Sequence, residues 1–136
     1  MKQYEFLEHT ADIKFISYGR TIEEAFSNSA YALKEIITKK TNIKENIEKE
    51  IMIFGKSNEK LLYNFIEEFL YLIDSQDFVL SKIKEIQIEK NKLKAKIIGD
   101  KFSDYKISNE VKAITYESLS VKKGEKGFSC EVVLDV

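Results

Sequence analysis

The chain has 136 residues, of which 43% are hydrophobic and 33% are charged, and its formal net charge at pH 7 is −1. This length and composition are typical of one globular domain with its own core, and they exclude a disordered chain. The near-neutral charge argues against a protein that binds nucleic acid through its overall field, because such binding needs clustered positive charge. Short basic stretches at 90–92 and 122–123 are interpreted as solvated turns.

The single cysteine, Cys130, excludes an internal disulfide. It alternates with Phe128, Val132 and Leu134 on one side of a strand pattern, so we expect a buried and unreactive thiol. No signal-peptide pattern opens the sequence, and no apolar run approaches the roughly 20 residues that a membrane-spanning helix requires. We therefore expect a cytoplasmic protein without a membrane partner.

Strand patterns recur along the whole chain. They combine apolar and β-branched residues at period-two spacing between turn residues. In chain order they lie at 4–7, 13–18, 51–54, 83–89, 93–98, 111–116, 119–122 and 128–136. Turn residues at 89–92 and 123–127 predict two hairpins in the second half.

Two long helices are predicted between the early strands. Thr21 and Glu24 form a capping-box pattern ahead of apolar and small residues at helical spacing over 22–37. Ser57 precedes a broader apolar stripe over 61–73, which predicts a core helix that can lie across a sheet.

Helices early in the chain and hairpins late in the chain are typical of the α+β class. We predict a single two-layer domain over residues 1–136. Its largely antiparallel sheet would contain about seven strands and carry both long helices on one face.

The polar segment 8–12 contains the only histidine of the chain, His9, three residues from Asp12. Loops between strands often expose functional groups on a rigid frame. Asp135 precedes Val136 at the far end of the sequence, so two aspartates and a terminal carboxylate converge if the two ends meet. Such oxygen ligands suit a hard cation, calcium or magnesium, whereas one histidine and one cysteine cannot fill a zinc site.

Each of these residues also has a structural interpretation, which is the more common outcome for residues of these types. Asp12 can cap a turn, Asp135 can end a strand, and His9 can orient the turn. A second interpretation is a metal-dependent hydrolase with His9 as the base and the aspartates as ligands. The single histidine and the absence of a serine elbow or a glycine-rich phosphate loop count against it.

Five blocks of the sequence resemble the archease family, in the family's order. They are residues 8–13, 19–26, 61–74, 112–116 and 132–136. Archeases are small cytosolic protein cofactors of the RtcB-type tRNA-splicing ligase, which joins RNA ends using GTP and manganese. The resemblance implies that this chain promotes guanylylation and repeated turnover of that ligase. It also implies that the chain is not itself an enzyme and meets RNA at most indirectly.

The resemblance also implies site residues. The family's metal site, often occupied by calcium, falls on Asp12, Asp135 and Val136 of this chain. A functional lysine of the family falls on Lys112. His9, in the opening motif, and Lys112 are therefore candidates for activating the partner.

The sequence departs from the family pattern at one position. Many members have a histidine after the Thr-Tyr pair that is found here at 115–116, but this chain has Glu117. Any role of that imidazole is absent, although the carboxylate could extend the acidic cluster. The alternative function within the family is a chaperone-like modulator of tRNA-modifying enzymes such as methyltransferases.

Overall fold

The computed structural model describes residues 1–7 and 12–136. Within these residues the chain forms two α-helices and seven strands, arranged in two antiparallel sheets. The strands are β1 (Tyr4–Leu7), β2 (Asp12–Gly19), β3 (Ile47–Phe54), β4 (Phe78–Glu89), β5 (Lys92–Lys101), β6 (Ala113–Gly124) and β7 (Gly127–Asp135). The helices are α1 (Ile22–Thr38) and α2 (Asn58–Gln76), and a short 3₁₀ turn, η1 (Phe102–Asp104), follows β5. The predicted α+β class is confirmed.

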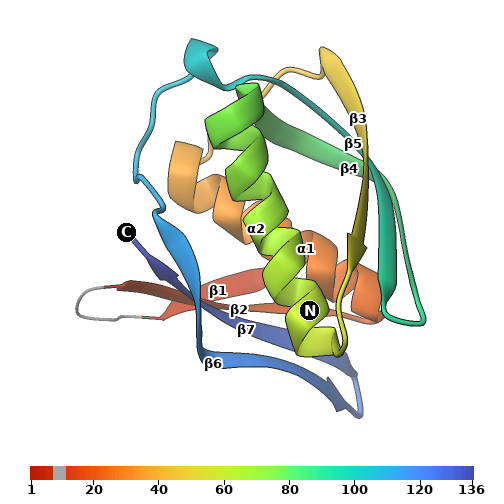
Figure 1. Ribbon diagram of the computed structural model, residues 1–136. Coiled ribbons are helices and arrows are strands. Elements are labelled where there is room, and N and C mark those ends of the chain that lie inside the picture. Colours follow the sequence, from red (N-terminus) through yellow and green to blue (C-terminus); the bar gives the residue numbers. More distant parts are fainter. Residues whose placement is uncertain (8–11) are drawn as a thin grey trace.

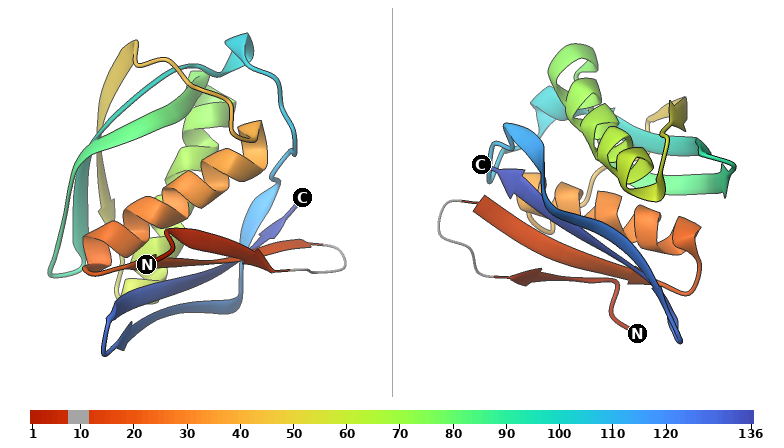
Figure 2. Two further views of the ribbon diagram at one scale, coloured as in Figure 1. Left: turned by 180° about the vertical axis from the view of Figure 1, so that it is seen from behind. Right: turned by 60° about the horizontal axis from the view of Figure 1, so that its bottom comes forward.

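The strands do not form one continuous sheet. One sheet has the order β1-β2-β7-β6 and the other has the order β3-β5-β4. Both α1 and α2 lie in the angle between these sheets and pack against a face of each (Figures 1 and 2). The hairpin β4–β5 pairs with β3, whereas the hairpin β6–β7 pairs with the N-terminal strands, and this choice of partners separates the two sheets.

Each helix begins at the capping residue that the sequence predicts. The Thr21 hydroxyl accepts a hydrogen bond from the amide of Glu24 at 3.1 Å, and the Ser57 hydroxyl accepts one from the amide of Lys60 at 3.1 Å. The Glu24 carboxylate accepts from the amide of Arg20 at 3.3 Å, one residue before the cap. These bonds satisfy amides that a helix start would otherwise leave without partners.

The core lies where the helices meet the sheets. Phe15, Phe26 and Phe65 are fully buried there, and the rings of Phe26 and Phe65 lie 5.8 Å apart. Cys130 is also fully buried, and this burial raises the pKa of its thiol to about 12. The expectation of a buried cysteine is therefore confirmed.

The strand β6 joins the two strands that the sequence predicts at 111–116 and 119–122. Thr115 pairs with Val133 and Ser120 pairs with Glu131, so residues 116–119 bulge out of the ladder. Bulges re-aim side chains away from the regular pleat. In the part of the chain that the structure describes, no helix is long and apolar enough to cross a membrane.

Candidate functional site

Two aspartates from distant parts of the sequence face each other across one ladder. Asp12 is the first residue of β2 and Asp135 is the last residue of β7, and the antiparallel register pairs them directly. Directly opposed residues have Cα atoms roughly 4.5–5.5 Å apart and project their side chains from the same face. Figure 2 shows the end of β7 beside the start of β2.

Lys112 lies on the other side of the same strand end. Its amide donates a hydrogen bond to the main-chain oxygen of Asp135 at 2.8 Å, while Ala113 pairs with Asp135 in the ladder. The Lys112 side chain is exposed and Val136 is 38% exposed. The fold thus brings Asp12, Asp135, Val136 and the Lys112 backbone together. His9, the remaining predicted site residue, lies outside the described residues.

Glu117 lies farther along β6 than the residue that pairs with Asp135. It lies in the bulge of β6, where its amide donates to the Thr115 hydroxyl at 3.1 Å. It is four positions along the chain from Ala113, which places it on the order of 10 Å from the Asp135 end of the ladder. The suggestion that Glu117 extends the acidic cluster stays a prediction.

The donor set at the strand ends consists of oxygen atoms. Among residues 1–7 and 12–136, no group of three or more His, Cys, Asp or Glu side chains is placed to hold a metal ion. Asp12 and Asp135 are opposed there in the ladder, and Val136 follows Asp135 in the sequence. Such donors fit a hard cation of the calcium or magnesium type and do not fit zinc.

An open hollow of about 430 Å³ adjoins the aspartate pair. Asp12 lines it together with Phe6 from β1, Glu35 and Lys39 from the end of α1, and Asn109. The Phe6 side chain is 40% exposed, and the Asn109 side chain donates to the main-chain oxygen of Ile36 at 3.0 Å. Apart from Asp12, the sequence patterns did not single out these residues, because the hollow forms only when α1, β1 and the segment before β6 pack together.

The charged groups near the hollow are held by specific contacts. The Tyr4 hydroxyl donates to the Glu35 carboxylate at 2.8 Å, and burial followed by this hydrogen bond raises the pKa of Tyr4 to about 12. Lys14 of β2 forms an ion pair with Glu131 of β7 at 3.1 Å. An ion pair therefore joins β2 to β7 close to the aspartates.

The fold and this site define a small α+β domain with acidic groups gathered at one end of a sheet. Residues 4–136 match the model of the Archease protein family (MTH1598/TM1083). The chain belongs to this family.

Individual archeases and their structures agree with that assignment. The archease of Saccharolobus solfataricus is 41% identical over 140 residues that cover all of both chains. The archease of Methanosarcina mazei is 36% identical over 141 residues, which cover 99% of this chain and 97% of the relative.

Two solved structures are similar to this one. The solution structure of protein 1598 of Methanobacterium thermoautotrophicum covers both chains fully, with a TM-score of 0.86 and 28% identity. The crystal structure of a Thermotoga maritima archease, described as a possible chaperone, has a TM-score of 0.65 and 26% identity over 96% of this chain and 94% of that one.

Proposed function

We propose that this protein is a non-catalytic activator of an RtcB-type RNA ligase in the cytoplasm. In this role it promotes guanylylation of the ligase and its repeated turnover during tRNA splicing or RNA repair. The observation that carries the proposal is the direct pairing of Asp12 with Asp135 in a chain of the archease family.

A divalent cation completes the proposed site. Like charges directly opposed across a ladder destabilise it, and a cation held by both carboxylates removes that repulsion. Asp12, Asp135 and the main-chain oxygens of Val136 would hold the ion, with water in the remaining positions. Calcium is the favoured ion because it accepts irregular oxygen sites, and magnesium is the second candidate.

The surface around this site is suited to docking on a partner. The backbone of Lys112 bonds to Asp135 and its side chain is exposed, and the hollow lined by Phe6 and Lys39 adds an apolar and a basic contact. His9, three residues before Asp12 in the sequence, is the second candidate for contact with the ligase. An activator shifts its partner only by binding the competent state more tightly than the other state.

The test is guanylylation of a purified RtcB-type ligase with labelled GTP, with and without this protein and with a chelator. The variants Asp12→Asn and Asp135→Asn keep the side-chain shape and remove the charge, so they should abolish the stimulation. Glu125→Gln, at an exposed position in the β6–β7 hairpin, is the matched control and should stimulate fully. Full stimulation by both aspartate variants would contradict the proposal.

One alternative function has support from a neighbour. The Thermotoga maritima structure is described as a possible chaperone, which supports a chaperone-like role. For this chain the alternative is a chaperone-like modulator of tRNA-modifying enzymes such as methyltransferases. Co-purification of the protein with a methyltransferase, together with unchanged ligase guanylylation, would favour this alternative over the activator.

A further inference from the structure

Large apolar side chains are exposed on the outer face of the β3-β5-β4 sheet, next to lysines. The register of β3 and β5 places Phe54 opposite Lys92 and Met52 opposite Lys94. Phe54 is 61% exposed and Met52 is 51% exposed. Exposed apolar side chains that are grouped together, rather than scattered, commonly mark an interaction site.

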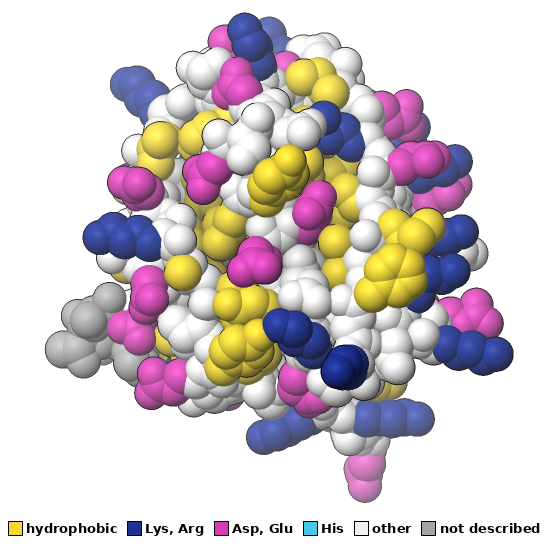
Figure 3. All heavy atoms as spheres, viewed as in Figure 1, with side chains coloured by type: hydrophobic (Ala, Val, Ile, Leu, Met, Phe, Trp, Pro, Cys, Tyr) yellow, Lys and Arg dark blue, Asp and Glu magenta, His cyan; other side chains and the backbone are white. Residues whose placement is uncertain are grey.

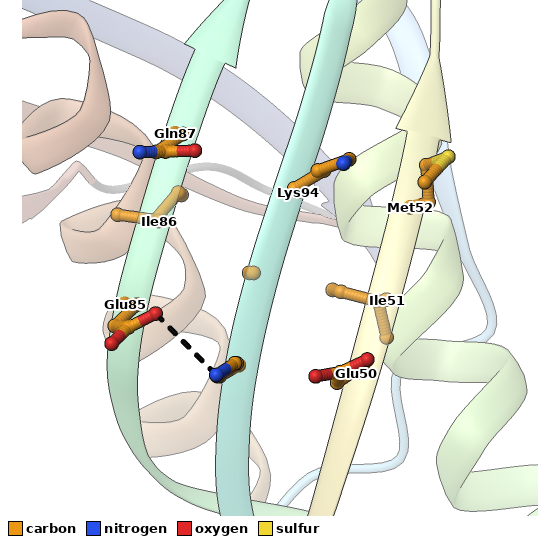
Figure 4. Close-up of a pocket in the computed structure, with 9 residues that line it drawn as sticks. Glu50, Ile51, Met52, Glu85, Ile86, Gln87 and Lys94 are labelled. Carbon is orange, nitrogen blue, oxygen red and sulfur yellow. Dashed lines mark ion pairs between the residues drawn. The ribbon is translucent and has the colours of Figure 1, made fainter.

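Charge is distributed unevenly along this sheet face. Lys96 forms an ion pair with Glu85 at 3.9 Å, with Glu50 opposite it on β3. Figure 4 shows Lys94 farther along β5, between Gln87 and Met52 on the neighbouring strands. The residues opposed to Lys94 are therefore neutral, whereas Lys92 is opposed by Phe54 on β3 and by Glu89 on β4. At this end of the sheet, the lysines at 90, 92 and 94 outnumber the carboxylate of Glu89.

The positive end continues into an open hollow of about 570 Å³ where β3 ends and α2 begins. Its described lining residues are Phe54, Gly55, Lys56, Lys60, Asn64, Lys90 and Asn91, and none of them is a carboxylate. The Gly55 amide donates to the Asn91 carbonyl at 3.0 Å, and the Asn64 side chain donates to the Phe54 carbonyl at 2.7 Å. These bonds fix the walls of the hollow before any ligand arrives.

Two stacked tyrosines extend the same surface. The rings of Tyr63 and Tyr116 are parallel within 2° and their centroids lie 4.1 Å apart. The Lys60 ammonium donates to the Tyr116 hydroxyl, which raises the pKa of Lys60 above its usual value. Figure 3 shows dark blue lysine and yellow hydrophobic side chains, together with magenta acidic ones, on the face formed by α2 and β3.

We infer that this surface, formed by Met52, Phe54, Lys56, Lys60, Lys90, Lys92 and Lys94 with Tyr63 and Tyr116, binds a single strand of RNA. Unpaired bases stack on exposed aromatic rings, and lysines neutralise the phosphates that follow. A peptide of acidic residues alone would pair with the lysines but would leave the exposed ring of Phe54 without a contact.

The site goes beyond the proposed activator role and lies on different residues. The aromatic rings and lysines of this surface are suited to any single-stranded nucleic acid. That the ligand is RNA and not DNA is an inference that rests on the proposed function. The net charge of −1 keeps the binding weak, because the remainder of the protein repels the phosphates. We expect dissociation constants on the order of 1–100 µM at low salt.

The experiment is fluorescence anisotropy with a fluorescein-labelled RNA of roughly 12 nucleotides without base pairing. The double variant Lys56→Glu/Lys94→Glu should bind at least about tenfold more weakly and show a shallower salt dependence, by about 1.4 in the log–log slope. Phe54→Ser should weaken binding by about fivefold or more. Circular dichroism verifies that each variant is folded.

Two matched controls keep the test specific. Lys122→Glu/Lys126→Glu makes the same charge change on the β6–β7 hairpin, and Tyr71→Ser removes another exposed ring of α2. Both should bind RNA with an affinity within about twofold of that of the unchanged protein, because the inferred binding depends on the position of the lysines and rings and not on overall charge or exposed area alone.

Four outcomes would overturn the inference. The first is that anisotropy does not change at about 100 µM protein and 50 mM salt, and the second is that Lys56→Glu/Lys94→Glu binds RNA with unchanged affinity. The third is that DNA of the same sequence binds with equal affinity, and the fourth is that poly-glutamate binds as tightly as RNA. Guanylylation is measured without RNA, so a failure of the activator proposal can be distinguished from a failure of the RNA-binding inference. Phe54→Ser should still stimulate guanylylation, and Asp12→Asn should still bind RNA.

Discussion

Asp12 and Asp135 are opposed partners in the β2–β7 ladder, one at the start of β2 and the other at the end of β7. Two carboxylates so placed repel one another, and this cost is about 0.2–1 kcal/mol for a like-charged cross-strand pair. If the proposed cation binds both carboxylates, its presence should stabilise the sheet.

The first prediction tests this linkage by thermal unfolding. In a chelator, Asp135→Asn should be as stable as the unchanged protein or more stable, because the repulsion is gone while the main-chain bonds of Asp135 remain. Calcium should raise the Tm of the unchanged protein by mass action and should leave the variant almost unaffected. Equal calcium shifts in both proteins would show that the pair does not hold the ion.

The second prediction concerns pH and Tyr4. Burial and the bond to Glu35 raise the pKa of Tyr4 from 10.0 to about 12 in the folded state, so folding favours the neutral phenol. This contribution is complete below pH 10 and is lost as the pH rises towards 12. Urea unfolding of Tyr4→Phe should show a loss of about 1 kcal/mol at pH 8, since one hydrogen bond is removed.

The difference between Tyr4→Phe and the unchanged protein isolates Tyr4 from the other groups that titrate in the same range. That difference should shrink between pH 10 and pH 12, because only the unchanged protein loses the contribution of this phenol. A constant difference across that window would contradict the assignment of the raised pKa to Tyr4.

The third prediction concerns close backbone packing at Gly99 in β5. A Cβ atom at this position would collide with the main-chain oxygen of Val79 and with the ring of Phe78. Gly99→Ala should therefore lower the free energy of unfolding by about 2–4 kcal/mol, since backbone cannot easily move aside.

A second glycine in the chain supplies the control for this substitution. At Gly124 the nearest atom to an added Cβ is the Gly127 oxygen at 3.9 Å, an ordinary contact. Gly124→Ala should change stability by less than about 0.5 kcal/mol. Similar urea midpoints for the two variants would argue against close packing at Gly99.

The fourth prediction concerns the reactivity of Cys130. Its thiol is fully buried and its pKa is raised to about 12, so almost no thiolate forms near neutral pH. The native protein at pH 8 should resist iodoacetamide, and the protein in urea should be alkylated rapidly. Mass spectrometry of intact protein gives the extent of labelling, and complete labelling of the native state within minutes would be inconsistent with this burial.

Local patterns were sufficient for most of the elements. Thr21 and Ser57 cap the helices that their sequences predict, because capping depends on residues three or four positions apart. The strand at 113–124 shows the limit of this reasoning. Its two halves looked like separate strands, since the bulge at 116–119 contacts α2, where the ring of Tyr116 stacks on Tyr63.

The sequence by itself determined the α+β class, the ends of the helices, the hairpins and the buried thiol, because these depend on near neighbours and on apolar spacing. Only the tertiary structure decided that β3 pairs with β5, that Asp12 faces Asp135, and that Phe54 lies beside lysines of β5 and α2. Strand partners far apart in sequence are selected by the packing of whole faces around the helices, and no local residue pattern encodes that selection.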